Sequence, residues 1–222
     1  MQKRDFLKIL VPATAVGALL SNRVFGKILI HNSKNQNTQK TNKKSMKIVV
    51  LTGSPRKNGN SAYLAEQFIK GAEESGHNVF RFDAAFQKVE GCTACNHCGM
   101  DGDCVLKDDF ETVRPHIVAA DIVVFVSPMY YFGLSAQIKT VIDRFYAINE
   151  QIKGKRKKTA FLMTYANATK EDAQPMLLHY RTMANYLGWE DAGTVIASGV
   201  WTAGAIRNTN YGEKAYQLGK NI

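Results

Sequence analysis

The chain of 222 residues is 45% hydrophobic and 22% charged, so it has the length and composition of a globular domain that can bury a full core. Its formal net charge of +10 comes mainly from the first 45 residues, which hold nine of the 29 basic residues and one of the 19 acidic ones. The remaining 20 basic and 18 acidic residues nearly cancel, which argues against a nucleic-acid partner for the globular part.

Residues 1–26 have the pattern of an export segment. Lys3 and Arg4 precede an apolar stretch over residues 9–20, which is too short to span a bilayer. The run Lys3-Arg4-Asp5-Phe6-Leu7-Lys8 resembles the twin-arginine export motif, with a lysine in place of its first arginine. We therefore expect an exported, periplasmic protein with no stable membrane span.

Residues 27–45 are predicted to be a linker between this segment and the globular domain. From residue 31 to 45 the chain has no apolar side chain, so the stretch cannot pack and is expected to be disordered. The globular domain is expected over residues 46–222. Its first residue is Met46, and a start of translation there would instead give a cytoplasmic protein.

The start of the globular domain reads as strand, tight loop and helix. The apolar run Ile48–Leu51 predicts the strand, and apolar residues at helical spacing after Ser61 predict a helix that Gly76 closes. A loop rich in Gly, Ser and Asn turns N–H groups inward, and a helix N-terminus adds unpaired amides, so together they favour a bound phosphate. The candidate phosphate donors in this loop are Ser54, Arg56, Asn58, Asn60 and Ser61.

The kind of phosphate follows from what the loop lacks. Lys57 precedes Asn58 rather than Ser or Thr, so this is not a Walker loop, and the dinucleotide pattern Gly-x-Gly-x-x-Gly is missing as well. Hydroxyls, amides and one guanidinium suit a single terminal phosphate monoester. The alternative is a plain turn and helix cap, because Asn and Ser are ordinary N-cap residues.

A second strand is predicted over Val79–Phe82, and a cysteine-rich loop over residues 91–105 follows it. This loop holds all four cysteines of the chain: Cys92, Cys95, Cys98 and Cys104. Packing does not explain that density, and disulfides would close very small, strained rings. Three cysteines at successive intervals of three, with a fourth close behind, favour a [4Fe–4S] cluster over zinc, which usually takes two separate Cys-x-x-Cys pairs. Zinc and free thiols stay as alternatives.

The rest of the chain alternates between helices and strands. Helices are expected over 108–120, 138–145, 175–187 and 212–219, and strands over 121–126, 159–164 and 194–197. Asp108 and Glu111 are placed like a capping box at the start of the first of these helices. Five strands alternating with helices predict an α/β fold with a doubly wound parallel sheet, whose ligands gather at the carboxyl ends of the strands.

The run from Ser127 to Gly133 leaves the carboxyl end of a central strand, at the same edge as the phosphate loop. Proline and glycine predict a loop here, and three adjacent aromatic rings cannot all point inward. The candidates to bind a flat aromatic ligand are Pro128, Met129, Tyr130, Tyr131, Phe132 and Gly133. The alternative is that these rings belong to the core.

Three other features carry weaker signals. Trp201 follows the last strand, where it either covers a substrate or closes the core. The basic run Lys153–Lys158 is expected to join a helix to a strand through solvent. His97, inside the cysteine loop, is expected to be exposed because four thiolates already complete a ligand set.

Two motifs together resemble the flavodoxin-like family of NADPH-dependent FMN reductases. They are Ser54-x-Arg56-x-x-Gly59-Asn60-Ser61 and Pro128-x-Tyr130-Tyr131-Phe132-Gly133, the second followed by Lys139 and Asp143-Arg144. The resemblance runs from Met46 to the C-terminus and implies a flavodoxin-like five-stranded parallel sheet of order 2-1-3-4-5. It also implies FMN, with its phosphate in the first loop and its isoalloxazine edge against residues 128–133. In that family the loop after the fourth strand, here residues 165–167, also lies near the flavin.

The cysteine loop resembles that of the iron-sulfur flavoprotein branch, whose compact cysteine motif occupies the corresponding insertion after strand 2. The resemblance implies an FMN-dependent oxidoreductase with a [4Fe–4S] cluster beside the flavin and with no catalytic side chain. In an exported chain the electron donor is expected to be a redox protein or a quinol, and in a chain starting at Met46 it is NAD(P)H. The electron acceptor is a redox partner protein or a small molecule, and the family's dimers and tetramers imply a homo-oligomer.

Two other interpretations stay open at this point. One is an FMN-dependent NAD(P)H:acceptor reductase, for instance one that reduces FMN or quinones, with zinc or bare thiols in the cysteine loop. The other is a non-catalytic electron carrier of the flavodoxin type.

Overall fold

The computed structural model describes residues 44–222. The expected export segment and almost all of the expected linker lie outside the described residues. Within the described part of the chain, no helix combines the length and the apolar character needed to cross a membrane.

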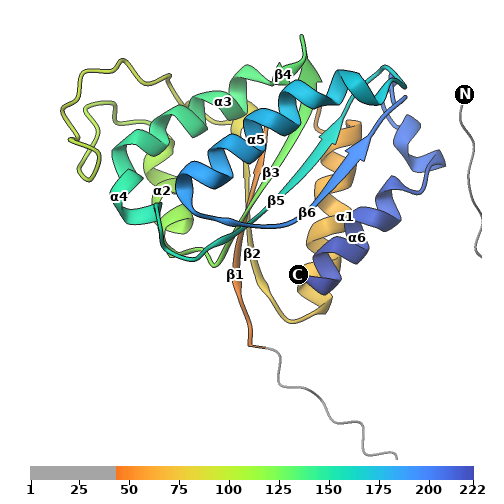
Figure 1. Cartoon of the computed structure of the whole chain (residues 1–222), viewed down its shortest axis with the longest axis horizontal. Helices are drawn as coiled ribbons and strands as arrows, with labels where there is room; N and C mark the ends of the chain where they lie inside the picture. The colour runs from red at the N-terminus through yellow and green to blue at the C-terminus, as the bar shows by residue number, and fades with distance from the viewer. Residues whose placement is uncertain (1–43) are drawn as a thin grey trace, which may run out of the picture. The chain divides into compact units, whose positions relative to one another are not determined.

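The centre of the structure is a parallel sheet with helices on both faces (Figure 1). The strands are β1 Lys47–Thr52, β2 Asn78–Asp83, β3 Ile122–Tyr130, β4 Gly133–Leu134, β5 Lys158–Thr164 and β6 Glu190–Ala197. The α-helices are α1 Asn60–Glu74, α2 Phe110–Ala119, α3 Ala136–Asp143, α4 Asn149–Ile152, α5 Gln174–Leu187 and α6 Tyr211–Asn221. Short 3₁₀ helices occupy η1 Ala84–Phe86, η2 Arg144–Ile148, η3 Lys170–Ala173 and η4 Ala205–Asn208.

The strand order is β2-β1-β3-β5-β6, with every neighbouring pair parallel, and this confirms the predicted doubly wound sheet of order 2-1-3-4-5. The additional strand β4 pairs antiparallel with the end of β3 in a short hairpin. This hairpin was not predicted, because a strand of two residues is too short to show a pattern.

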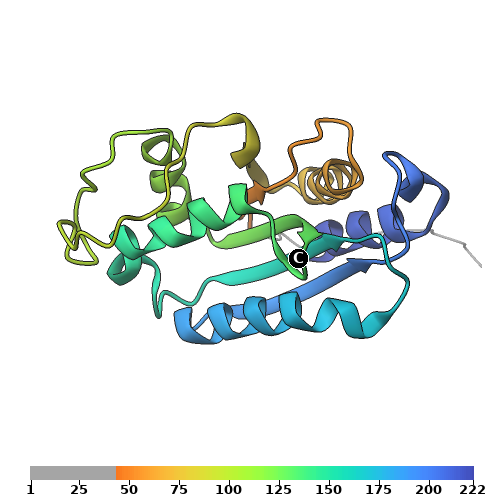
Figure 2. The same ribbon diagram turned by 90° about the horizontal axis from the view of Figure 1, so that it is seen from above.

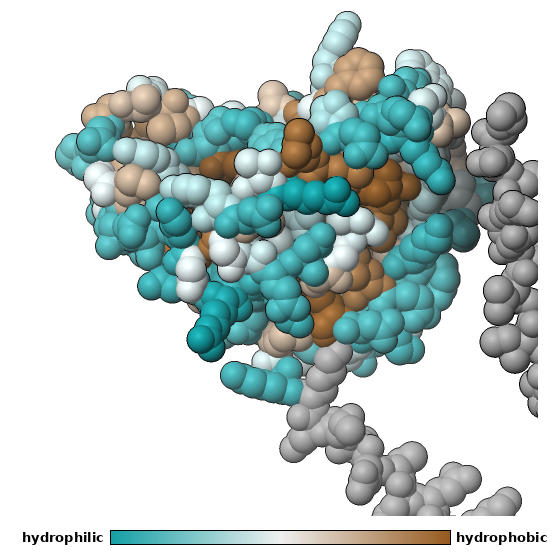
Figure 3. Space-filling view, in the orientation of Figure 1, coloured by the Kyte–Doolittle hydropathy of each residue, from teal (hydrophilic) through white to brown (hydrophobic). Residues whose placement is uncertain are grey.

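The sheet divides the core into two halves (Figure 2). In β3, Ile122, Val124 and Val126 belong to the half that α1 and α6 cover, whereas Val123 and Phe125 belong to the half that α2, α3 and α5 cover. Successive side chains of a strand point to opposite faces, so a strand buried on both faces is apolar without alternation. On the face shown in Figure 3 most of the surface is hydrophilic, and hydrophobic residues gather near β6 and α6.

Two predicted boundaries differ from the observed ones by four residues. The predicted loop from Ser127 begins later, because Ser127 and Pro128 still pair with β5 and β3 continues to Tyr130. The last strand begins at Glu190 rather than Thr194. Its first four residues, Glu-Asp-Ala-Gly, include no large apolar side chain and two of them are exposed, as an edge strand allows, so their sequence carries no strand signal.

The predicted capping box at the start of α2 does not form. The helix begins at Phe110, its N-cap residue Asp109 makes no capping hydrogen bond with its side chain, and the Glu111 side chain does not bond back to Asp108. The carboxylate of Asp108 instead accepts hydrogen bonds from the backbone N–H groups of Phe110 (3.0 Å) and Glu90 (2.9 Å) and from Nη1 of Arg144 (2.7 Å). Arg144 and Asp108 are a buried ion pair, with 1% and 5% of their side chains exposed.

The basic run before β5 is not entirely in solvent. Lys153, Lys155 and Arg156 are exposed, as predicted, but Lys157 is buried. Its ammonium donates to the carbonyl oxygens of Val118 (2.7 Å) and Ala120 (2.6 Å), at the C-terminal end of α2. A cation there satisfies carbonyls that the helix leaves unpaired. Burial is the main cause that lowers the pKa of this lysine.

Helices α1 and α6 touch through two glycines. A Cβ on Gly71 would overlap the carbonyl oxygen of Tyr216, and a Cβ on Gly219 would overlap that of Phe68.

We expect Gly71→Ala to lower the free energy of unfolding by about 1–3 kcal/mol, as overpacking does, although alanine favours helices by roughly 0.5–1 kcal/mol over glycine. Urea unfolding measures this. The control is Gly91→Ala, where an added Cβ meets nothing within 4 Å. Equal midpoints for the two variants would contradict the close packing.

Asp108 predicts an acid-labile contribution to stability. Burial alone would raise its pKa, but hydrogen bonds from Glu90 N–H, Arg144 and Phe110 N–H lower the pKa overall from its usual 3.8. Below 3.8 the unfolded chain binds a proton that the folded chain does not, so the stabilisation is complete above this pH and is lost as the pH falls through the folded pKa. We expect the stability difference between the wild type and Asp108→Asn to shrink over this range. A difference independent of pH, in denaturant unfolding from pH 6 to 3, would contradict the ion pair.

Candidate functional site

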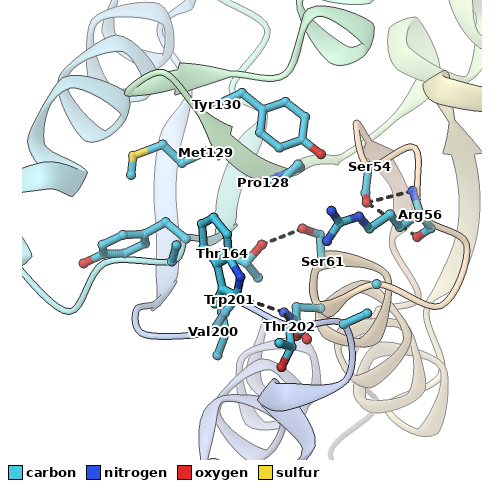
Figure 4. Close-up of a pocket in the computed structure, with 15 residues that line it drawn as sticks. Ser54, Arg56, Ser61, Pro128, Met129, Tyr130, Thr164, Val200, Trp201 and Thr202 are labelled. Carbon is cyan, nitrogen blue, oxygen red and sulfur yellow. Dashed lines mark hydrogen bonds between the residues drawn. The ribbon is translucent and has the colours of Figure 1, made fainter.

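A cleft of about 520 Å³ opens at the carboxyl ends of β1, β3, β5 and β6 (Figure 4). Its residues come from the four loops or strand ends that meet at this edge of the sheet. They are Ser54, Arg56, Gly59, Asn60, Ser61, Pro128, Met129, Tyr130, Thr164, Tyr165, Ala166, Val200, Trp201, Thr202 and Ala203. The carboxyl edge of a parallel sheet is the expected place for a ligand, and the volume suits a small organic cofactor.

One wall of the cleft is the loop between β1 and α1. The Ser54 hydroxyl accepts a hydrogen bond from the Arg56 N–H (3.2 Å), which helps to form the turn, and Arg56 itself is exposed. The first turn of α1 begins at this wall, with Gly59 as N-cap and no acidic residue in the turn. The unpaired N–H groups and positive dipole end of α1 therefore face the cleft without a competing carboxylate.

Asn60 and Ser61 tie this wall to the opposite one. The Asn60 amide donates to the carbonyl oxygens of Val200 (3.0 Å) and Thr202 (2.9 Å), and its oxygen accepts from the Ile206 N–H (3.3 Å). The Ser61 hydroxyl lies 2.7 Å from that of Thr164. The side chain of Asn60 is thus already bonded within the protein, whereas its backbone N–H belongs to the open first turn of α1. Asn58, the remaining predicted donor, does not line the cleft.

The aromatic run is divided by the hairpin. Pro128, Met129 and Tyr130 line the cleft, but Tyr131, Phe132 and Gly133 do not. Tyr131 and Phe132 form the two-residue turn between β3 and β4, with φ of 46° and 62°. Positive φ at both positions is typical of a tight hairpin turn, which places these rings on the surface, and Tyr131 is fully exposed.

The wall opposite the phosphate loop follows β5 and β6. Residues 165 and 166, which the family resemblance suggested, line it, and so does Trp201 with 77% of its surface exposed. Tyr165 is buried, and burial raises its pKa. Thr164, Val200, Thr202 and Ala203 were not predicted, since no motif marks them. Their position at or after the carboxyl end of a strand was the only signal.

All four cysteines line one small hollow away from the cleft. Thr93, Asn96, Arg144, Tyr146 and Ala147 complete its lining. The thiols are free; Cys92 and Cys95 are exposed, while Cys98 and Cys104 are half-buried. Hydrogen bonds from the His97 backbone and then from the Thr93 side chain lower the pKa of Cys95, which favours its thiolate. His97 is exposed, as predicted.

The backbone of the cysteine loop is unusual. Residues 87–109 contain no helix or strand, and Ala94, Asn96 and Met100 have positive φ values of 55°, 57° and 71°. Non-glycine residues rarely adopt this conformation, and it persists only where surrounding contacts hold it. One such contact is the hydrogen bond from the Tyr146 hydroxyl to the Asn96 side-chain oxygen (2.7 Å). Within residues 44–222, no group of three or more His, Cys, Asp or Glu side chains is close enough to hold a metal ion.

The cleft and the hollow have no lining residue in common. In Figures 1 and 2 the loop of residues 87–109 lies at the left end of the described domain, and the segment after β6 lies at the right end. The two sites therefore have separate linings within one chain, and the expectation that flavin and cluster lie side by side stays a prediction.

Comparisons with known proteins agree with this architecture. Solved structures with the same fold include an NAD(P)H:quinone oxidoreductase from Methanothermobacter marburgensis (TM-score 0.61, 18% identity, covering 80% of this chain and 96% of that one). Another is an azoreductase from Bacillus anthracis (TM-score 0.61, 17% identity, covering 80% and 100%). At this level of identity the likeness establishes the fold alone.

Curated relatives are closer in sequence. An iron-sulfur flavoprotein of Archaeoglobus fulgidus is 34% identical over 127 residues, which are 57% of this chain and 58% of the relative. An iron-sulfur flavoprotein of Methanocaldococcus jannaschii is 32% identical over 99 residues, which are 45% of this chain and 51% of the relative. The matches thus span little more than half the length of these relatives.

The model of the NADPH-dependent FMN reductase family matches residues 46–202. That range contains the phosphate loop, the cysteine loop, the β3–β4 hairpin and most of the far wall of the cleft. The resemblance inferred from the two motifs is confirmed, and the chain belongs to the NADPH-dependent FMN reductase family.

Proposed function

We propose that this protein is an FMN-dependent oxidoreductase that binds FMN in the cleft at the carboxyl edge of the sheet. The observation that carries the proposal is the pairing, in one cleft, of an anion-binding helix end with flat apolar and aromatic walls. The first part suits a phosphate monoester, and the second suits a planar ring system. Membership of the FMN reductase family supports the same ligand.

The residues of the cleft divide the binding between them. Arg56, the Ser54 hydroxyl and the backbone N–H groups of the first turn of α1 would hold the phosphate. Met129, Tyr130 and Trp201 would flank the rings and keep water from them. Bound FMN supplies transfer of a hydride or of electrons, so no side chain of this chain needs to act as acid, base or nucleophile.

We propose further that the four cysteines hold a [4Fe–4S] cluster, which supplies one-electron transfer. Their spacing, their common hollow and the left-handed residues between them suit a loop wrapped around a compact group. A single metal ion needs every ligand atom at about 2.0–2.3 Å from one point, whereas a cubane binds each cysteine through a different iron and so needs the sulfurs further apart. The names of the curated relatives support a cluster.

The electron donor and acceptor follow from where the protein works. We propose an exported protein whose donor is a redox protein or a quinol; a chain that started at Met46 would use NAD(P)H. The cleft and the hollow share no lining residue, and we propose that a second copy of the chain brings their two groups together, in line with the predicted homo-oligomer. A cluster-free NAD(P)H:quinone reductase and a non-catalytic carrier are the outcomes that the tests below distinguish.

Arg56→Ala tests the proposed phosphate-binding site at the start of α1. Removing one charge-assisted hydrogen bond should raise the Kd for FMN about 10- to 100-fold and leave riboflavin, which has no phosphate, unaffected. Quenching of Trp201 fluorescence measures binding, since the other tryptophan, Trp189, is buried and bonded to the Ile152 carbonyl. Lys57→Ala is the control, because this neighbouring cation lies over the Phe86 ring, outside the cleft. An equal loss of FMN affinity in both variants, or failure of the wild type to bind FMN, would refute the proposal.

Anaerobic incubation with iron and sulfide tests the cysteine loop. We expect roughly four irons and four acid-labile sulfides per chain and a broad visible absorption that dithionite bleaches. Replacing any one of the four cysteines by alanine should lower iron uptake severalfold, whereas His97→Ala, in the same loop, should not. Stoichiometric zinc without labile sulfide, or no metal at all, would favour the cluster-free reductase. Oxidation of NAD(P)H or a quinol with a small acceptor then distinguishes an enzyme from a carrier.

A further inference from the structure

Arg144 is the largest fully buried side chain in the described part of the chain, and it lies beneath the cysteine loop. Its Nη1 donates to the Asp108 carboxylate (2.7 Å) and to the Glu90 carbonyl oxygen (3.1 Å), and its Nη2 donates to the Leu106 carbonyl oxygen (3.0 Å). The guanidinium also lies over the Phe110 ring, with 4.9 Å from its carbon to the ring centroid.

These acceptors lie at the two ends of the cysteine loop. Glu90 precedes Cys92, while Leu106 and Asp108 follow Cys104, so one guanidinium joins the segments that enter and leave the loop. Asp108 also joins these two segments, which form the base of the loop, because its carboxylate accepts a hydrogen bond from the Glu90 N–H. Lys88 and Asp109 form a second link below it, through Lys88 N–H to the Asp109 carboxylate (2.7 Å) and Asp109 N–H to the Lys88 carbonyl (3.0 Å). The loop has no strand or helix of its own, so these polar contacts fix its ends.

One nitrogen of Arg144 makes none of these bonds. Its Nε is buried and has no hydrogen-bond partner among residues 44–222. Buried donors are almost always paired, because an unpaired one keeps the full cost of losing water. Arg144 lines the hollow that the four cysteines share, so a group seated there is the available acceptor. Anionic sulfur atoms can accept such a bond, and hydrogen bonds to sulfur tune iron-sulfur sites.

We propose that Arg144 is the positioning residue of the cysteine site. Its Nη groups hold the two ends of the loop together before any metal is bound, and we call these contacts to Glu90, Leu106 and Asp108 the clasp. Its Nε–H donates to an anionic sulfur of the group held in the hollow. The second half of this proposal rests on the proposed cluster, whereas the first half does not. Arginine suits the role because its planar fork presents donors in several fixed directions, which a lysine ammonium does not.

Arg144→Lys tests the first half in the full-length, reduced and metal-free protein. Lysine keeps the positive charge but cannot reach acceptors on both ends of the loop. We expect iodoacetamide to alkylate the half-buried Cys98 and Cys104 about tenfold faster than in the wild type, as followed by mass spectrometry. Alkylation at the wild-type rate would overturn the clasp.

Arg114→Lys is the matched control. Arg114 also binds the loop, through the Asp103 carboxylate (2.8 Å) and the Gly102 carbonyl oxygen (3.3 Å), but it does not line the hollow. Its alkylation rates should stay within about twofold of the wild type, and an increase equal to that of Arg144→Lys would refute a special role for Arg144. If Arg144→Lys fails to fold by circular dichroism, Asp108→Asn replaces it. Asp108→Asn removes the ion pair and should accelerate alkylation of Cys98 and Cys104 severalfold. Alkylation at the wild-type rate in this variant would count against the clasp.

Release of iron to a chelator tests the second half after anaerobic reconstitution with iron and sulfide. We expect Arg144→Lys to release iron about tenfold faster than Arg114→Lys, because the Nε–H donor is missing. Equal release rates would overturn the Nε–H bond. If the wild type itself forms no cluster, the proposed cluster fails, whereas the alkylation rates still decide the clasp. The two proposals therefore fail in different experiments.

Discussion

The parallel arrangement of the five long strands is the constraint on which the rest of this structure depends. Because these strands point the same way, the loops after β1, β3, β5 and β6 all leave the sheet at one edge. Residues as distant in sequence as Ser54, Tyr130, Thr164 and Trp201 therefore line a single cleft. The crossover from β1 to β2 requires a helix, and this helix begins at the same edge, so an anion-binding helix end comes with the topology.

Buried polar groups then determine which side chains are left for a ligand. Asn60 looked like a phosphate donor, but its amide and oxygen satisfy three backbone groups of the segment after β6. The bonds to the Val200 carbonyl and the Ile206 N–H are buried, where an unpaired polar group is costly. Asn60 thus builds the cleft by joining two of its walls, as Ser61 does through Thr164. The charged donor Arg56 and the amides of the first turn of α1 stay open to the cleft.

The cysteine loop follows a different principle from the sheet. It has no ladder of backbone hydrogen bonds and little apolar burial, so its shape depends on a few polar contacts at its base and on whatever the cysteines bind. The buried Arg144–Asp108 pair is the centre of that base. A buried ion pair is stabilising only when hydrogen bonds satisfy both partners, and Asp108 meets this condition with two backbone N–H donors. The two residues are far apart in the chain, since Asp108 precedes the central strand β3 in sequence and Arg144 follows it.

The sequence by itself determined that the long strands run parallel, because unbroken apolar runs separated by helical patterns indicate a sheet covered on both faces, whereas the strand order came from the family resemblance. It also located the phosphate loop and the cysteine loop, since glycine, serine and cysteine at short spacings carry their chemistry locally. Only the tertiary structure decided that Tyr131 and Phe132 form a turn outside the cleft, that Asn60 joins two walls, and that Asp108 pairs with Arg144. The last two outcomes depend on hydrogen-bond partners that are distant in sequence, and a local pattern contains no information about which partner a buried polar group will find.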